Sequence, residues 1–135
     1  MNWKLIFLLS LFGLAMGLAT VWIIPGSIEP FFWLAIFVVS AYLIATRSGG
    51  RYFLHGLLTS LANSFWVTVA HAAFFYTYIV TNPEYLQMTN GLSPDLAGHP
   101  RRLMLAIGPI TGIISGIVLG FFAWVASRLI NRNTQ

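Results

Sequence analysis

The sequence contains no cysteine and few charged residues, and each shortage limits what the chain can be. Without cysteine it can form no disulfide, thiolate zinc site or iron–sulfur site, and it has no thiol nucleophile. Charged residues make up 7% of the chain, against roughly 25% in soluble globular domains. Hydrophobic residues make up 58%. So few charges cannot cover a particle of this size in water, and we predict an integral membrane protein.

Positive charge is in excess, with seven Lys or Arg against three Asp or Glu, but its distribution does not favour nucleic-acid binding. A nucleic-acid site needs basic residues clustered on one face, whereas these residues stand singly or in pairs beside apolar segments. We expect the lipid bilayer as the surrounding partner and no nucleic acid. No repeat or long linker divides the chain, so residues 1–135 form one predicted domain.

Four apolar segments are long enough to cross a bilayer. A hydrocarbon core about 30 Å thick requires about 20 mainly apolar residues in a helix. The segments cover residues 5–24, 31–46, 52–80 and 103–130. Helices satisfy their own backbone hydrogen bonds in lipid, whereas a closed barrel would need many more strands. The predicted fold class is an all-α membrane protein, a bundle of four transmembrane helices.

The basic residues also predict how the chain is oriented, because short loops rich in Lys and Arg stay in the cytoplasm. If both termini are cytoplasmic, five basic residues lie on that side and two, Arg101 and Arg102, on the other. The five are Lys4, Arg47, Arg51, Arg128 and Arg132. We therefore expect both termini in the cytoplasm.

The connection between the third and fourth spans, residues 81–102, contains two helix-start signals. Asn82-Pro83-Glu84 and Ser93-Pro94-Asp95 each supply an N-cap, a first-turn proline and an acidic residue. We predict one or two short interfacial helices that cap the outer face. Two uses fit this pattern: a lid over a cavity, or a connector that rests on the lipid headgroups.

The third span carries most of the polar residues within the membrane. At 100° per residue, most of them share one side of the helix, and polar groups inside a span are a functional hypothesis by default. The candidates for lining a cavity or ligand site are Thr59, Asn63, Trp66, His71 and Tyr78. The alternative is structural, with interhelical hydrogen bonds from Asn63 and His71 and core packing by Trp66.

Metal and catalytic sites lack the residues that they need. His55 and His71 are separated by about 24 Å along one helix, so they cannot share an ion. No cysteine or carboxylate completes a set with His71 and His99. No nucleophile–base set or phosphate-binding loop is evident either. We predict no metal, no cofactor and no enzymatic activity.

The fourth span repeats glycine every four residues, which produces a groove that admits another helix backbone closely. The glycines are Gly108, Gly112, Gly116 and Gly120, and the first span offers Gly13 and Gly17 as a partner surface. An intrachain contact and a homodimer both fit. We predict a function in helix–helix association, as a homo-oligomer or as a small accessory subunit of a membrane complex. The alternative is a dimeric transporter, or a carrier of a small ligand or lipid, that uses the polar side of the third span.

One ordered set of features carries a resemblance: Gly49-Gly50 before the third span, Tyr78 near its end, the step Asn82-Pro83-Glu84, and the glycine-rich last span. From Gly49 onward the chain resembles a broad bacterial family of four-helix inner-membrane proteins of unknown function. The resemblance implies four helices in a bacterial inner membrane and brings no catalytic residues. An aspartate is more usual in that family at the position of Asn82.

Overall fold

The computed structural model describes residues 1–132, with side chains up to residue 130. The side chain of Arg132, one of the residues used to predict orientation, lies outside this part. The elements are α1 (Trp3–Trp22), α2 (Glu29–Arg47), α3 (Tyr52–Ala73), α4 (Phe75–Thr81), α5 (Glu84–Asn90), α6 (Pro94–Ala97) and α7 (Pro100–Arg132). Helices α1, α2, α3 and α7 are long and apolar enough to cross a membrane. The all-helical class with four candidate spans is therefore confirmed.

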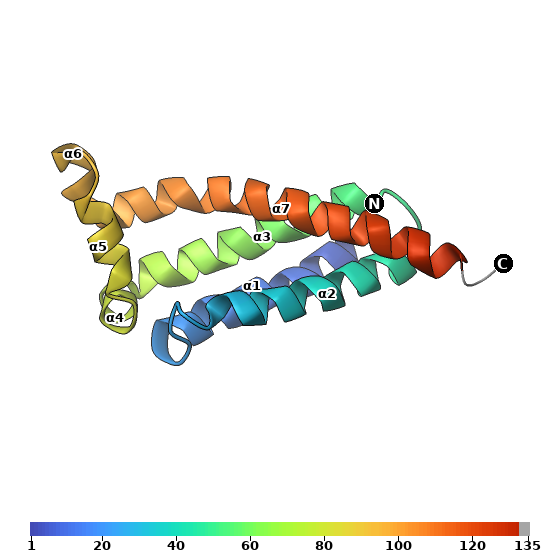
Figure 1. Ribbon diagram of the computed structural model, residues 1–135, viewed down its shortest axis with the longest axis horizontal. Coiled ribbons are helices and arrows are strands. Elements are labelled where there is room, and N and C mark those ends of the chain that lie inside the picture. The colour runs from blue at the N-terminus through green and yellow to red at the C-terminus, as the bar shows by residue number, and fades with distance from the viewer. Residues whose placement is uncertain (133–135) are drawn as a thin grey trace.

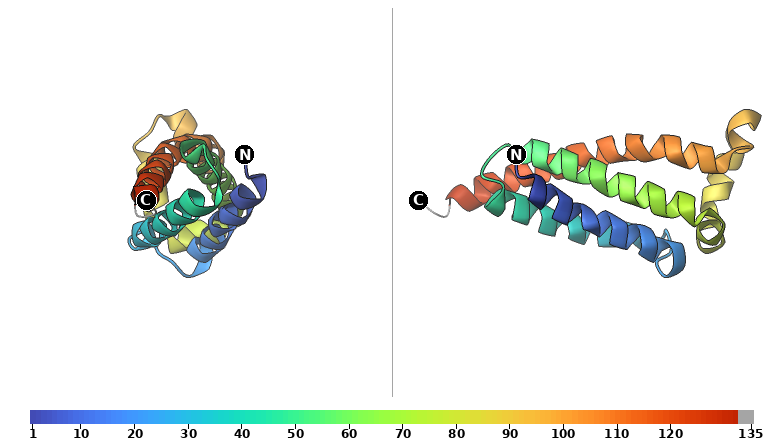
Figure 2. Two further views of the ribbon diagram at one scale, coloured as in Figure 1. Left: turned by 90° about the vertical axis from the view of Figure 1, so that its right-hand side faces the viewer. Right: turned by 180° about the vertical axis from the view of Figure 1, so that it is seen from behind.

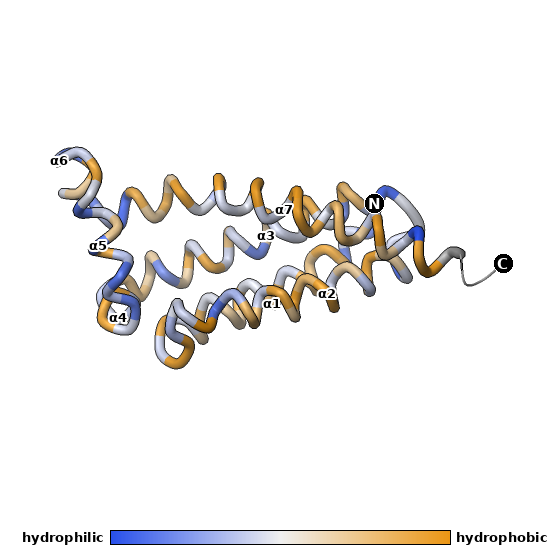
Figure 3. Tube along the Cα trace, in the orientation of Figure 1, coloured by the Kyte–Doolittle hydropathy of each residue, from blue (hydrophilic) through white to orange (hydrophobic). Residues whose placement is uncertain are grey.

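The four long helices lie side by side, and the short helices gather at one end of them (Figure 1). We call this end the cap end. The start of α1, the α2–α3 connection and the C-terminal part of α7 lie at the opposite end, the terminal end (Figure 2). Hydrophilic residues concentrate at the two ends and at points along α3, while the rest of the long helices is largely hydrophobic (Figure 3). Helices α5 and α6 confirm that the 81–102 connection contains short helices.

The predicted third span, 52–80, is wrong as a single helix. Phe74 has φ −104° and ψ 34°, which ends α3 at Ala73, and the chain restarts as α4 at a different angle. No glycine or proline marks this break. The turned segment is held instead by long-range hydrogen bonds. Thr81 Oγ1 donates to the Val21 carbonyl at 2.8 Å, and Asn82 Nδ2 donates to the Thr20 carbonyl at 3.0 Å.

Helix α3 lies between α1 and α7, which is not the arrangement expected from the glycines. The first span was expected to fill the glycine groove of the fourth, but α3 fills it. A Cβ added at Gly56 of α3 would lie 2.6 Å from the Gly120 Cα of α7. The glycines of α1 also face α3, since a Cβ at Gly17 would lie 3.0 Å from the Val67 Cα. Both sets of small residues therefore serve close packing on the same central helix.

The helices pack most tightly at the terminal end. A buried apolar cluster there joins α1, α2 and α7, and its members are Leu5, Leu9, Ala41, Ile44, Leu119 and Ala123. Helix α2 packs mainly on α7 and only weakly on its sequence neighbours α1 and α3. Towards the cap end α2 and α7 diverge (Figures 1 and 2). This divergence leaves the polar side of α3 partly uncovered.

Candidate functional site

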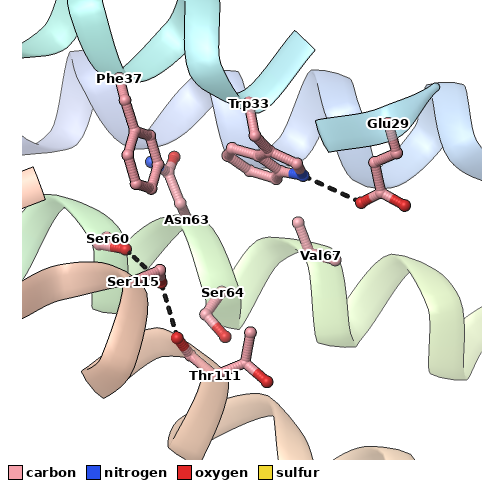
Figure 4. Close-up of a pocket in the computed structure, with 9 residues that line it drawn as sticks. All are labelled: Glu29, Trp33, Phe37, Ser60, Asn63, Ser64, Val67, Thr111 and Ser115. Atoms are coloured by element: carbon pink, nitrogen blue, oxygen red, sulfur yellow. Dashed lines mark hydrogen bonds between the residues drawn. The ribbon is translucent and has the colours of Figure 1, made fainter. Parts of the chain in front are cut away.

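A cavity of about 220 Å³, which we call the main chamber, lies between α2, α3 and α7 (Figure 4). Its lining residues are Glu29, Trp33 and Phe37 of α2, Ser60, Asn63, Ser64 and Val67 of α3, and Thr111 and Ser115 of α7. A second cavity of about 200 Å³, the cap chamber, shares Ser64, Val67 and Thr111 with it and extends to His71, Tyr78 and Tyr85. Because they share lining residues, we treat the two chambers as one interhelical cavity.

The α2 wall of the main chamber is aromatic and ends in a carboxylate. Trp33 and Phe37 lie one helical turn apart with ring centroids 6.1 Å apart. Trp33 Nε1–H donates to Glu29 Oε1 at 2.9 Å. Glu29 occupies the first turn of α2, where the helix dipole favours an acidic residue. The spacing of four residues places all three side chains on one face of α2.

The opposite wall, formed by α3 and α7, carries serine hydroxyls whose protons are donated to other groups of the protein. Ser115 Oγ–H donates to the Thr111 carbonyl at 2.6 Å, and Ser64 Oγ–H donates to the Gly108 carbonyl at 2.5 Å. Ser60 Oγ lies 2.7 Å from Ser115 Oγ. Since the Ser115 proton goes to a carbonyl, Ser60 is the donor in that pair. The free positions on these oxygens are therefore lone pairs.

Asn63 is the buried polar group of the cavity whose hydrogen bonding is incomplete. Its side chain is 2% exposed. Oδ1 accepts the Gly13 N–H at 2.8 Å, which ties α3 to α1. Nδ2 has no hydrogen-bond partner within the described part of the chain. A buried donor left unpaired costs about 1–3 kcal/mol, so an acceptor that reached Nδ2 from the main chamber would be stabilised by this amide.

Three aromatic rings that line the cap chamber are in contact with one another in series. His71 lies against Tyr78, with centroids 4.0 Å apart and planes at 23°, and Tyr78 meets Tyr85 edge-on at 5.9 Å. The Tyr85 hydroxyl donates to the Pro100 carbonyl at 2.8 Å, and burial raises the pKa of this phenol. The ring of Tyr85 thus links α5 to the start of α7 and closes the cap end of the cavity.

His71 also bonds across to α1. Its Nε2 lies 2.7 Å from Thr20 Oγ1, and that hydroxyl lies 2.8 Å from the Met16 carbonyl. The hydroxyl proton is donated to the carbonyl, so His71 Nε2–H must be the donor to Thr20. In this tautomer Nδ1 is an acceptor, and it forms no hydrogen bond with any residue that the structure describes.

The structure brings together three of the five predicted site residues. Asn63, His71 and Tyr78 line the interhelical cavity. Thr59 is fully buried, and its hydroxyl has no partner among the described residues, but it does not line either chamber. Trp66 faces α1, where its Nε1–H donates to Ser10 Oγ at 3.3 Å. The aromatic wall is supplied by α2 instead.

Sequence reasoning missed the residues that α2 and α7 contribute. Glu29, Thr111 and Ser115 were not among the candidate site residues. A signal for each set exists in the sequence: Glu29, Trp33 and Phe37 recur every four residues, as do Thr111 and Ser115. Which helix they would face depends on the packing of α2 against α7, which no local pattern specifies.

Within residues 1–130, no three His, Asp or Glu side chains are grouped as metal ligands. No family model matches the chain, and no curated protein or solved structure matches it.

Proposed function

We propose that this multi-pass membrane protein binds a small amphiphilic molecule in the interhelical cavity. The observation that carries the proposal is the Asn63 amide, which lines the main chamber at 2% exposure with Nδ2 unpartnered in the described chain. Buried polar groups in proteins are nearly always paired. A ligand acceptor bonded to Nδ2 would supply the missing partner.

The other lining groups support an amphiphilic ligand over a purely polar one. Small-molecule sites are mostly apolar, with a few placed polar groups that fix orientation. Trp33, Phe37 and Val67 provide the apolar surface, and the polar groups lie on the α3 and α7 walls. Together the two chambers fall within the roughly 300–1,000 Å³ typical of such sites.

The same proposal includes an orientation in a bacterial inner membrane. Lys4, Arg47, Arg51 and Arg128 belong to the terminal end, which supports a cytoplasmic position for that end. The cap end, which includes Glu29 at the start of α2, then faces the opposite side. That this membrane is a bacterial inner membrane is inferred from the family resemblance.

Helix–helix association is the second candidate function. Its main support was the glycine groove of α7, which α3 occupies: a Cβ at Gly116 would meet Leu57 and one at Gly112 would meet Ser64. An association function would therefore use another surface, such as the apolar face of α7 around Ile114. The ligand proposal has more specific support.

The test fills the cavity from a position whose side chain makes no hydrogen bond with the described residues. The Thr111 side chain lines both chambers, and its backbone carbonyl, not its hydroxyl, accepts the Ser115 bond. Thr111→Phe should occlude the cavity. Ile114→Phe is the matched control, since it adds the same ring to the exposed face of α7. Each variant is extracted gently from its host membrane and analysed by native mass spectrometry, followed by identification of any released small molecule.

We expect wild type and Ile114→Phe to retain a small molecule at a defined stoichiometry, and Thr111→Phe to have lost it. Equal retention by Thr111→Phe would contradict binding in this cavity. If every sample lacks a small molecule but has the mass of several chains, or contains other polypeptides, association becomes the better proposal.

A further inference from the structure

We infer that the ligand carries a protonated amine whose N–H groups bond to the walls of the main chamber. This inference rests on the proposed binding function and names the chemical class of the ligand. It follows from where the protons of the cavity are and from the one formal charge among its lining residues. Figure 4 shows Glu29 and the bonds of Ser60 and Ser115.

The serine hydroxyl protons of the main chamber are all donated within the protein. Ser115 and Ser64 donate to backbone carbonyls, and Ser60 donates to Ser115. Their oxygens keep lone pairs that accept no bond from the described residues. A hydroxyl with its proton committed can only accept from a ligand. The three serine oxygens thus favour a ligand group that donates.

Glu29 adds negative charge to the same chamber. Its Oε1 accepts the Trp33 Nε1–H, and Oε2 accepts no hydrogen bond from the part of the chain that the structure describes. No Lys or Arg is among the residues that line either chamber. A carboxylate without a neighbouring cation favours a cationic ligand, and the faces of Trp33 and Phe37 also attract cations.

The charge of Glu29 and the lone pairs of the serines together favour a specific class of cation. The carboxylate and the rings would accept any ammonium group, but lone pairs on Ser60 and Ser64 need a hydrogen-bond donor, which an ammonium group supplies only through its N–H groups. A primary or secondary ammonium meets both requirements, whereas a quaternary ammonium meets one. The Asn63 Nδ2–H groups then bond to an oxygen elsewhere on the same molecule.

The experiment uses four probes that share an aromatic ring and an ether oxygen, which can accept from Asn63. They are 2-phenoxyethylamine, 2-phenoxyethanol, phenoxyacetate and trimethyl(2-phenoxyethyl)ammonium. Affinity is measured by titration calorimetry on the full chain in nanodiscs of zwitterionic lipid, with empty nanodiscs subtracted to remove partitioning. Each probe is titrated into wild type, Glu29→Gln, Glu84→Gln and Thr111→Phe.

We expect wild type to bind the primary amine at least tenfold more tightly than the alcohol or the quaternary amine, and the carboxylate most weakly. Glu29→Gln keeps an acceptor for Trp33 but removes the charge, so its affinity for the amine should fall to that for the alcohol. Glu84→Gln removes an acid at the same end that lines neither chamber, and it should keep the preference.

Equal affinities for amine and alcohol, or a preference that survives Glu29→Gln, would overturn the inference. A quaternary amine that binds as tightly as the primary amine would overturn the N–H requirement. In either case, loss of all binding in Thr111→Phe would show that the cavity still binds ligands and that the proposed function stands. Binding that Thr111→Phe leaves unchanged would count against both proposals.

Discussion

Asn82→Asp tests how the cap end is held together. The Asn82 side chain is 1% exposed and bonds in three directions. Its Oδ1 accepts the Gly26 N–H at 2.8 Å, and its Nδ2 donates to the Thr20 carbonyl at 3.0 Å and the Tyr78 carbonyl at 3.3 Å. The Thr20 carbonyl lies at the end of α1, where carbonyls lack partners within the helix. Only a side chain that both accepts and donates meets these needs.

An aspartate keeps the acceptor but loses both donors. Two hydrogen bonds at about 1 kcal/mol each would be lost, and a carboxylate would face two carbonyl oxygens without water. We expect Asn82→Asp to lower the free energy of unfolding by about 3 kcal/mol at pH 7, within the range for a buried polar group left unpaired.

The assay is reversible unfolding in mixed micelles, followed by circular dichroism between pH 4 and pH 7. A buried, unpaired carboxylate has a raised pKa in the folded state, so the folded variant binds a proton more readily than the unfolded chain. Stability therefore falls as pH rises from about 4 through the folded pKa, and acid should partly rescue the variant. Asn82→Asp with wild-type stability and no such pH dependence would refute the reasoning.

Two further predictions concern packing and orientation. Gly56→Ala should lower the free energy of unfolding by about 1–3 kcal/mol, because its Cβ would lie 2.6 Å from the Gly120 backbone and force α3 and α7 apart; Gly91→Ala, which meets only the Met88 carbonyl at 3.7 Å, is the control and should change little. Since the chain has no native cysteine, single cysteines report topology directly: in intact cells a membrane-impermeant maleimide should label Gly91→Cys at the cap end and not Ser48→Cys at the terminal end. The reverse pattern would contradict cytoplasmic termini.

The sequence predicted the number, positions and helical nature of the spans because these depend on local composition. Twenty apolar residues in a row require a helix in lipid wherever they pack. The end of α3 at Phe74 could not be predicted in this way. Its cause is the pairing of Thr81 and Asn82 with carbonyls about 60 residues earlier in the chain, and such a long-range contact leaves no local signature.

The candidate site was predictable on one helix only. The polar side of the predicted third span stood out because polar residues are rare in a span, so Asn63 and His71 of α3 and Tyr78 of α4 were found. Glu29 and Trp33 were missed because α2 packs on α7 and not on its neighbours in sequence. The partner of the α7 glycines was mistaken for the same reason, since small residues indicate a close approach without specifying what approaches.

From the sequence, Asn63 and His71 could be either structural or ligand-binding residues. In the structure, different atoms of each side chain would serve these two roles. Asn63 Oδ1 and His71 Nε2 bond to α1, at Gly13 and Thr20. Asn63 Nδ2 and His71 Nδ1 make no hydrogen bond within the described chain, and both residues line the cavity. The bonds to α1 fix each ring or amide plane and so orient the free atom. An alanine at either position removes both roles together, so loss of binding there would not separate folding from recognition. Substitutions at Thr111 of α7 and at Glu29 of α2 change the cavity while the bonds from α3 to α1 stay intact.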